Sequence, residues 1–226
     1  MSTSSCSLCN FAKSSIGRKI IVALTGLGLV LFLAGHLSGN LLIFVSPGAF
    51  NEYAEFLHSF LHGTGVWIAR IGLLVLLFLH VWFTILLTKE NKGARTKYAH
   101  DATVQAPRSS RIMIWSGLTI LAFIVFHILH FTVRIDSDLA KIGETSPWHM
   151  VILGFQSPLV VIFYLIAMTL LCSHLSHGVS SIFQTLGLRS KKTAKPIAFL
   201  ANAYALVIYL GFISIPVAIL VFGFGS

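Results

Sequence analysis

The feature that most constrains this chain is an apolar stretch at residues 24–44, LTGLGLVLFLAGHLSGNLLIF, whose only ionisable side chain is His36. About 20 residues are enough for a helix to cross a bilayer, so this stretch predicts a membrane span. A polar side chain is costly at that depth, and an intramembrane histidine therefore indicates a functional site. Later apolar stretches also carry histidines: His80, His127, His130, His174 and His177. We interpret the chain as a scaffold that holds a group between these imidazoles.

Composition and charge pattern indicate a multi-pass membrane protein. Of the 226 residues, 56% are hydrophobic and only 10% are charged, which is unlike a soluble globular domain. The net charge of +9 would also suit a nucleic-acid-binding protein. Lys and Arg, however, lie in short segments between the apolar stretches, as membrane topology requires. We therefore expect membrane lipid, and no nucleic acid, as a partner.

The apolar stretches predict an all-α fold, a polytopic bundle of five transmembrane helices. A polar tail is expected at residues 1–18 and a membrane domain at 19–226, with spans at about 20–44, 66–88, 112–133, 150–183 and 197–224. Pro158 is expected to kink the long fourth span. The tail contains Cys6 and Cys9 as C-x-x-C without a following histidine, so it is not a covalent haem-attachment site, and we expect it to be disordered.

Basic residues accumulate on one side of the predicted bundle. The N-terminal segment and the loops after the second and fourth spans carry most of the Lys and Arg. The opposite side has only Arg134 and Lys141, with Arg70 at the edge of the second span. The positive-inside rule therefore predicts that the N-terminus is cytoplasmic and the C-terminus is outside.

With that topology, each intramembrane histidine has an expected depth. His36 and His127 lie about 25 Å and about 24 Å from the cytoplasmic ends of their spans, at 1.5 Å per residue. His80 and His177 lie about 14 Å and about 18 Å from the same side. The sequence thus predicts an outer layer with His36 and His127 and an inner layer with His80 and His177, separated by roughly 10 Å.

Two facing imidazoles in a dry helical bundle are the ligands that a bis-histidine haem requires. Spacing alone does not choose between His127 and His130, or between His174 and His177, and for any single histidine a hydrogen-bonded packing role is the alternative. Small residues let a porphyrin approach the backbone closely. The glycines placed for this are Gly26, Gly28, Gly35, Gly39, Gly72, Gly117 and Gly178.

Four segments carry recognisable motifs: GHLSGNLLIF followed by AFNEYAEFLHS, LHVWFTILLTKENKGARTKY, RIMIWSGLTILAFIVFHILHFTV, and HLSHGVSSIFQTLGL. They resemble the cytochrome b subunit of succinate dehydrogenase, in the five-helix, two-haem bacterial form that related fumarate reductases share. The resemblance covers most of the chain, apart from the N-terminal tail and much of the last span. It implies that His36 and His127 ligate the outer haem iron and that His80 and His177 ligate the inner one. His130 and His174 are then neighbours of the ligands.

The function implied by this resemblance is electron transfer in respiratory complex II, which belongs to the tricarboxylic acid cycle. The chain is then the anchor subunit of succinate:quinone oxidoreductase in the bacterial inner membrane. It is expected to carry two haem b groups and to have no catalytic residue for the dicarboxylate. A separate flavoprotein subunit and an iron–sulfur subunit are the implied partners, and the basic loops are candidate docking surfaces. The implied quinone is menaquinone.

Quinone reduction needs proton donors, and the titratable side chains nearest the outer layer lie in the loop after the first span. Glu55 and His58 are the candidates, with a solvated loop helix as the alternative reading. Two other functions are weighed for the whole chain. One is the cytochrome b subunit of another quinone-linked dehydrogenase, such as a fumarate reductase, hydrogenase or formate dehydrogenase. The other is a His-lined transporter, which the lack of Asp and Glu inside the predicted spans disfavours.

Overall fold

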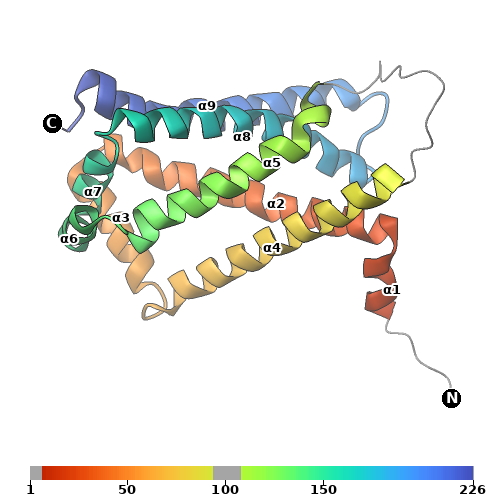
Figure 1. Ribbon diagram of the computed structural model, residues 1–226, viewed down its shortest axis with the longest axis horizontal. Helices are drawn as coiled ribbons and strands as arrows, with labels where there is room; N and C mark the ends of the chain where they lie inside the picture. Colours follow the sequence, from red (N-terminus) through yellow and green to blue (C-terminus); the bar gives the residue numbers. More distant parts are fainter. Residues whose placement is uncertain (1–6, 94–107, 226) are drawn as a thin grey trace.

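The fold is all-helical over the residues that the structure describes. The computed structural model describes residues 7–93 and 108–225, with side chains at 10–91 and 113–225. The long helices run side by side in one bundle (Figure 1). In chain order the elements are α1 (Ser7–Lys13), α2 (Ser15–Asn40), the 3-10 helix η1 (Leu41–Phe44), α3 (Pro47–Ser59), α4 (Thr64–Gly93), α5 (Arg108–His127), the π-helix η2 (Ile128–Val133), α6 (Ser137–Thr145), α7 (Pro147–Gly154), α8 (Pro158–Thr185) and α9 (Ala194–Phe222).

Five helical segments in the described ranges are long and apolar enough to cross a membrane, which confirms the predicted five-helix membrane bundle. α4 has the exposed apolar surface that is typical of a helix surrounded by lipid. None of its most apolar stretch is buried inside the protein, and it exposes large side chains such as Trp67, Phe78 and Trp82. The five segments are Ser15–Phe44, Thr64–Asn91, Met113–Val133, Pro158–Thr185 and Ala194–Phe222.

The fourth span begins later than the sequence predicts. The expected span at 150–183 is divided into α7 and α8, because α8 starts at Pro158 and Ser157 before it has an extended backbone (φ −80°, ψ 118°). Proline has no N–H and restricts the preceding residue to extended conformations, so it suits the first turn of a helix better than its middle. The expected kink is therefore a complete helix break.

The N-terminal tail is also more ordered than predicted. The polar tail around Cys6 and Cys9 was expected to be disordered, but Ser7–Lys13 forms α1, and α2 already begins at Ser15. Ser14 explains that start, because its hydroxyl accepts a hydrogen bond from the backbone N–H of Gly17 at 3.0 Å, which caps the helix. Cys6 and the side chain of Cys9 lie outside the described residues.

The two ends of the bundle differ in charge. One end holds α1, the end of α4, the start of α5 and the α8–α9 connection (Figure 1). We call it the basic end, and its basic residues with described side chains are Lys13, Arg18, Lys19, Lys89, Arg189, Lys191, Lys192 and Lys195. The opposite end, called the C-terminal end, holds α3, α6, α7 and the C-terminus. The part of the second basic loop at residues 94–107 lies outside the described residues.

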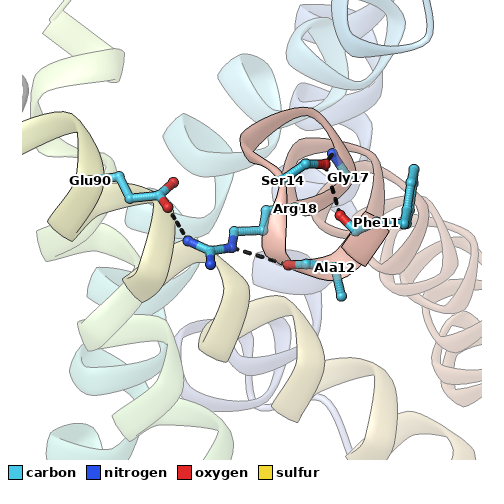
Figure 2. A network of polar contacts seen from close by, with 6 residues as sticks. All are labelled: Phe11, Ala12, Ser14, Gly17, Arg18 and Glu90. Atoms are coloured by element: carbon cyan, nitrogen blue, oxygen red, sulfur yellow. Dashed lines mark hydrogen bonds and ion pairs between the residues drawn. The ribbon is translucent and has the colours of Figure 1, made fainter. Parts of the chain in front are cut away.

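At the basic end, Arg18 ties the start of α2 to α4. Its guanidinium donates to the backbone oxygen of Ala12 at 3.1 Å and forms an ion pair with Glu90 (Figure 2). The pair is partly exposed, so its contribution to stability is small. The pair links α2 to α4, the helices that carry His36 and His80.

α2 lies in the middle of the bundle and packs against α4, α8 and α9, while α5 packs against α8. The Tyr204 hydroxyl of α9 donates to the backbone oxygen of Val30 at 2.5 Å. Close packing at Gly211 leaves no room for a side chain, because a Cβ there would lie 2.7 Å from Leu37. This arrangement lets side chains of α2 face α4 and α8 at two different depths.

The C-terminal end is closed by a buried tryptophan. Trp148 of α7 is 7% exposed, and its indole N–H donates to the backbone oxygen of Ile43 at 3.1 Å. Its backbone N–H donates to Oδ1 of Asn51 at 2.9 Å, and the Asn51 amide donates to Ser146 at 3.1 Å. Asn51 therefore joins α3 to the start of α7.

Replacing this asparagine, Asn51→Ala, is expected to lower the free energy of unfolding by about 1–3 kcal/mol, because the Trp148 N–H loses its acceptor. Denaturant unfolding in detergent micelles measures the change. Glu52→Ala, at the exposed neighbouring position, is the matched control and should leave the unfolding midpoint in place. Equal midpoints for both variants would show that Asn51 does not stabilise this end.

Candidate histidine layers

The histidines nearer the C-terminal end are called the outer layer, as in the sequence analysis. The histidines nearer the basic end are called the inner layer. In the outer layer, the rings of His36 on α2 and His127 at the end of α5 are 5.9 Å apart between centroids, with their planes at 83°. The structure thus brings together the two residues that the sequence assigns to this layer. Aromatic rings pack around them and keep the surroundings apolar: Phe32 and Phe212 against His36, and Phe123 and Phe131 against His127.

Tyr164 joins the outer layer from α8, and sequence reasoning missed it. Its hydroxyl lies 3.1 Å from Nδ1 of His127 and 3.1 Å from Nδ1 of His130. The chain changes from α-helix to π-helix directly after His127, and π-helical turns are frequent at functional sites. A tyrosine has one hydroxyl hydrogen, so it donates to one ring and accepts the Nδ1–H of the other.

The inner layer contains His80 on α4, paired with Thr25 on α2. Nδ1 of His80 lies 3.3 Å from the Thr25 hydroxyl. That hydroxyl donates its own hydrogen to the backbone oxygen of Ile21 at 2.7 Å, so it is the acceptor for the Nδ1–H of His80. The other ring nitrogen, Nε2, then keeps its lone pair. Gly26 lies beside the ring: a Cβ there would be 3.2 Å from Cε1 of His80.

His174 on α8 has the same arrangement with Ser116 on α5. Its Nδ1 lies 3.3 Å from the hydroxyl of Ser116, which is 1% exposed and donates to the backbone oxygen of Met113 at 3.1 Å. The hydroxyl is therefore the acceptor for Nδ1–H of His174, and Nε2 of this ring also keeps its lone pair. His174 lies within electrostatic range of His80 across the bundle. The structure thus brings His174 into the inner layer.

His177 is the residue that the sequence prediction assigns to this position, and its surroundings differ. Among the described residues no side chain forms a hydrogen bond with its ring, whereas Arg189 in the segment after α8 lies within electrostatic range. A metal-ligating histidine almost always has its second nitrogen in a hydrogen bond that fixes the ring. His174, whose Nδ1 lies at the Ser116 hydroxyl, therefore has the hydrogen-bonded ring that is typical of a ligand, and this geometry favours it over His177.

The two layers recur on three helices. The distance between them is 10 or 11 residues, or about 16 Å along the helix axis at 1.5 Å per residue, which exceeds the roughly 10 Å expected from the sequence. The residues that mark the layers are Thr25 and His36 on α2, Ser116 and His127 on α5, and His174 and Tyr164 on α8.

The residues of both layers fit a haem. Imidazole nitrogens from facing helices are a donor set for haem iron, and the apolar surroundings exclude water. A Cβ at Gly178, next to His177, would meet nothing within 4 Å, whereas Gly35 and Gly72 are exposed, so the open space at these two positions faces the surroundings of the bundle and not the histidines. Gly28 and Gly39 serve helix packing instead, because a Cβ there would lie 3.0 Å from Leu76 and 2.4 Å from Tyr53.

The two proton-donor candidates lie on the exposed side of α3. Glu55 and His58 are both exposed, and the His58 Nδ1–H donates within its own helix to the backbone oxygen of Ala54 at 2.8 Å. α3 contacts the bundle through Asn51 and Tyr53. The structure does not bring Glu55 or His58 into contact with the histidines of the outer layer.

No cluster of three or more His, Cys, Asp and Glu side chains that could hold a bare metal ion occurs in the described part of the chain. A comparison with known protein families, curated proteins and solved structures finds no match to this chain.

Proposed function

We propose that this chain is the dihaem membrane-anchor subunit of a succinate:quinone oxidoreductase. The observation that supports it best is the pair of histidine layers, about 16 Å apart. Each layer presents imidazoles from different helices, and hydroxyl groups lie within hydrogen-bond distance of Nδ1 of His80, His174 and His127, whereas the Asn40 amide nitrogen lies 3.3 Å from Nδ1 of His36. The motif resemblance to the succinate dehydrogenase cytochrome b subunit points to the same function.

In this proposal His36 and His127 hold the outer haem b, and His80 holds the inner haem b. For the fourth ligand the geometry favours His174, and the motif resemblance favours His177. A bound haem iron supplies reversible one-electron chemistry. The chain's own side chains supply the rest: Thr25 and Ser116 fix the ring orientation of the inner histidines, and the surrounding phenylalanines exclude water from the outer ones.

The basic end is proposed to face the cytoplasm, with the C-terminus outside. Its cluster of Lys and Arg supports this orientation by the positive-inside rule. The flavoprotein and iron–sulfur subunits would dock at this end, and menaquinone would be bound at the C-terminal end, in the inner membrane of a bacterium. Glu55 and His58 are the candidate proton donors there, and their exposure on α3 keeps them accessible to solvent.

The test is the haem content of the purified chain. We expect two haem b per chain and a reduced-minus-oxidised spectrum with b-type absorption bands, measured by haem extraction and optical spectroscopy. A variant with His36, His80, His127 and His174 all replaced by alanine is the control and should be haem-free. A well-folded preparation without haem would contradict the proposal and move the His-lined transporter to first place. A dihaem chain that does not assemble with the soluble subunits would point to another quinone-linked dehydrogenase.

A further inference from the structure

Tyr164 has a hydrogen-bonding environment that no other part of the proposed function uses. The side chain is 5% exposed and its hydroxyl is 3.1 Å from Nδ1 of both His127 and His130. Because a single hydroxyl hydrogen serves two rings, the direction of the two hydrogen bonds is coupled. If Tyr164 donates its hydrogen to Nδ1 of one ring, its oxygen accepts the Nδ1–H of the other ring. The other ring then carries its proton on Nδ1.

The hydroxyls of the inner layer differ from Tyr164, because each has a backbone acceptor within its own helix. The hydroxyls of Thr25 and Ser116 each donate to a backbone oxygen of their own helix, and so accept from a histidine. A tyrosine hydroxyl lies at the end of a rigid ring, too far from its own helix to use a backbone oxygen in this way. It needs an acceptor from elsewhere, and the two within reach are Nδ1 of His127 and Nδ1 of His130, both at 3.1 Å.

We infer that Tyr164 is a positioning residue of the outer layer: it accepts the Nδ1–H of His127, donates its own hydrogen to Nδ1 of His130, and thereby keeps Nε2 of His127 free as a ligand. The direction of this chain rests on the proposed function, because a ligating His127 must carry its proton on Nδ1. His130 then acts as the acceptor that keeps the tyrosine hydrogen away from His127.

The first test is Tyr164→Phe, which retains the ring and removes the hydroxyl. We expect about 10- to 100-fold weaker retention of the outer haem, the usual effect of losing a hydrogen-bond partner of a metal ligand. We also expect a higher midpoint potential for that haem alone, because a ligand without this hydrogen bond donates less electron density to the iron. Tyr209→Phe is the matched control, since the Tyr209 hydroxyl lies 3.5 Å from Thr169 on α8, away from the histidines.

The second test is His130→Phe, which leaves Tyr164 in place and removes the acceptor of its hydrogen. The hydroxyl can then turn toward Nδ1 of His127, so we expect the Nε2–H form of His127 to increase. Nitrogen-15 NMR of histidine-labelled chain, prepared without haem, measures which ring nitrogen carries the proton. In the unsubstituted chain His127 is expected to carry its proton on Nδ1.

These readouts separate the two proposals. If the chain binds two haems but Tyr164→Phe changes neither the retention nor the potential of the outer one, the positioning role is overturned and the proposed function stands. If the chain binds no haem, the proposed function is overturned. The positioning role is then decided by which ring nitrogen of His127 carries the proton in the NMR measurement. His127 protonated on Nε2, or a tautomer unaffected by both variants, would overturn it.

Discussion

The variant His174→Ala is expected to bind one haem per chain instead of two, with only the inner haem lost. The reason is the position of this ring: Ser116 holds its Nδ1, and His80 lies within electrostatic range across the bundle. His177→Ala is expected to retain both haems, because its ring forms no side-chain hydrogen bond within the described ranges. Haem extraction and low-temperature optical spectra of the two variants, prepared side by side, measure the difference.

Ser116→Ala tests independently whether His174 or His177 is the ligand of the inner haem. If His174 is the ligand, loss of the hydroxyl removes the acceptor that fixes its ring, and we expect about 10- to 100-fold weaker retention of the inner haem. If His177 is the ligand, the same substitution should have no effect on haem retention. Loss of the inner haem in His177→Ala together with normal retention in Ser116→Ala would restore the assignment made from the sequence motif.

The sequence was sufficient to predict five membrane-spanning helices and the proximity of His36 and His127. A run of about 20 apolar residues leaves few alternatives to a membrane helix. His36 and His127 were paired because both lie at a similar distance from the cytoplasmic ends of their spans, and the structure brings their rings to 5.9 Å between centroids. Such predictions depend on distances along one helix axis, which follow directly from residue number.

Distance along the helix axis could not decide between His174 and His177 as the partner of His80. Which of the two faces the bundle depends on the rotation of α8 about its own axis. His174 and His177 are three residues apart, which turns their side chains about 60° from one another. Their rotation is fixed by contacts to other helices, such as that between His174 and Ser116. The helix also begins only at Pro158, where the sequence predicted a kink within a longer span.

The hydroxyl partners were missed for a related reason. Thr25, Ser116 and Tyr164 look like ordinary small or aromatic residues of a membrane helix, and no spacing within the sequence links residue 25 to residue 80 or residue 116 to residue 174. Only the packing of α2 against α4 and of α5 against α8 brings each hydroxyl to its histidine. A signal was nevertheless present, since hydroxyls within apolar spans need hydrogen-bond partners.

His36→Ala should remove the outer haem and leave the inner one unchanged in content and spectrum. His36 provides one of the two facing rings of the outer layer, and the inner layer is about 16 Å away along α2. Sites that far apart without shared partners behave independently, so the double variant His36→Ala with His174→Ala should be haem-free. Haem content and redox spectra of the single and double variants test this additivity.

The functional consequence of His36→Ala separates the two layers further. In the complex with its soluble subunits, succinate should still reduce the inner haem, whereas reduction of added menaquinone analogue should fall to the background rate, because the quinone is proposed to lie at the C-terminal end. His149→Ala is the matched control, since this histidine also lies at that end but is exposed and hydrogen-bonded to Ser146 at 2.9 Å. Full quinone reduction without the outer haem would place the quinone site near the inner layer instead and contradict the proposed order of the two haems.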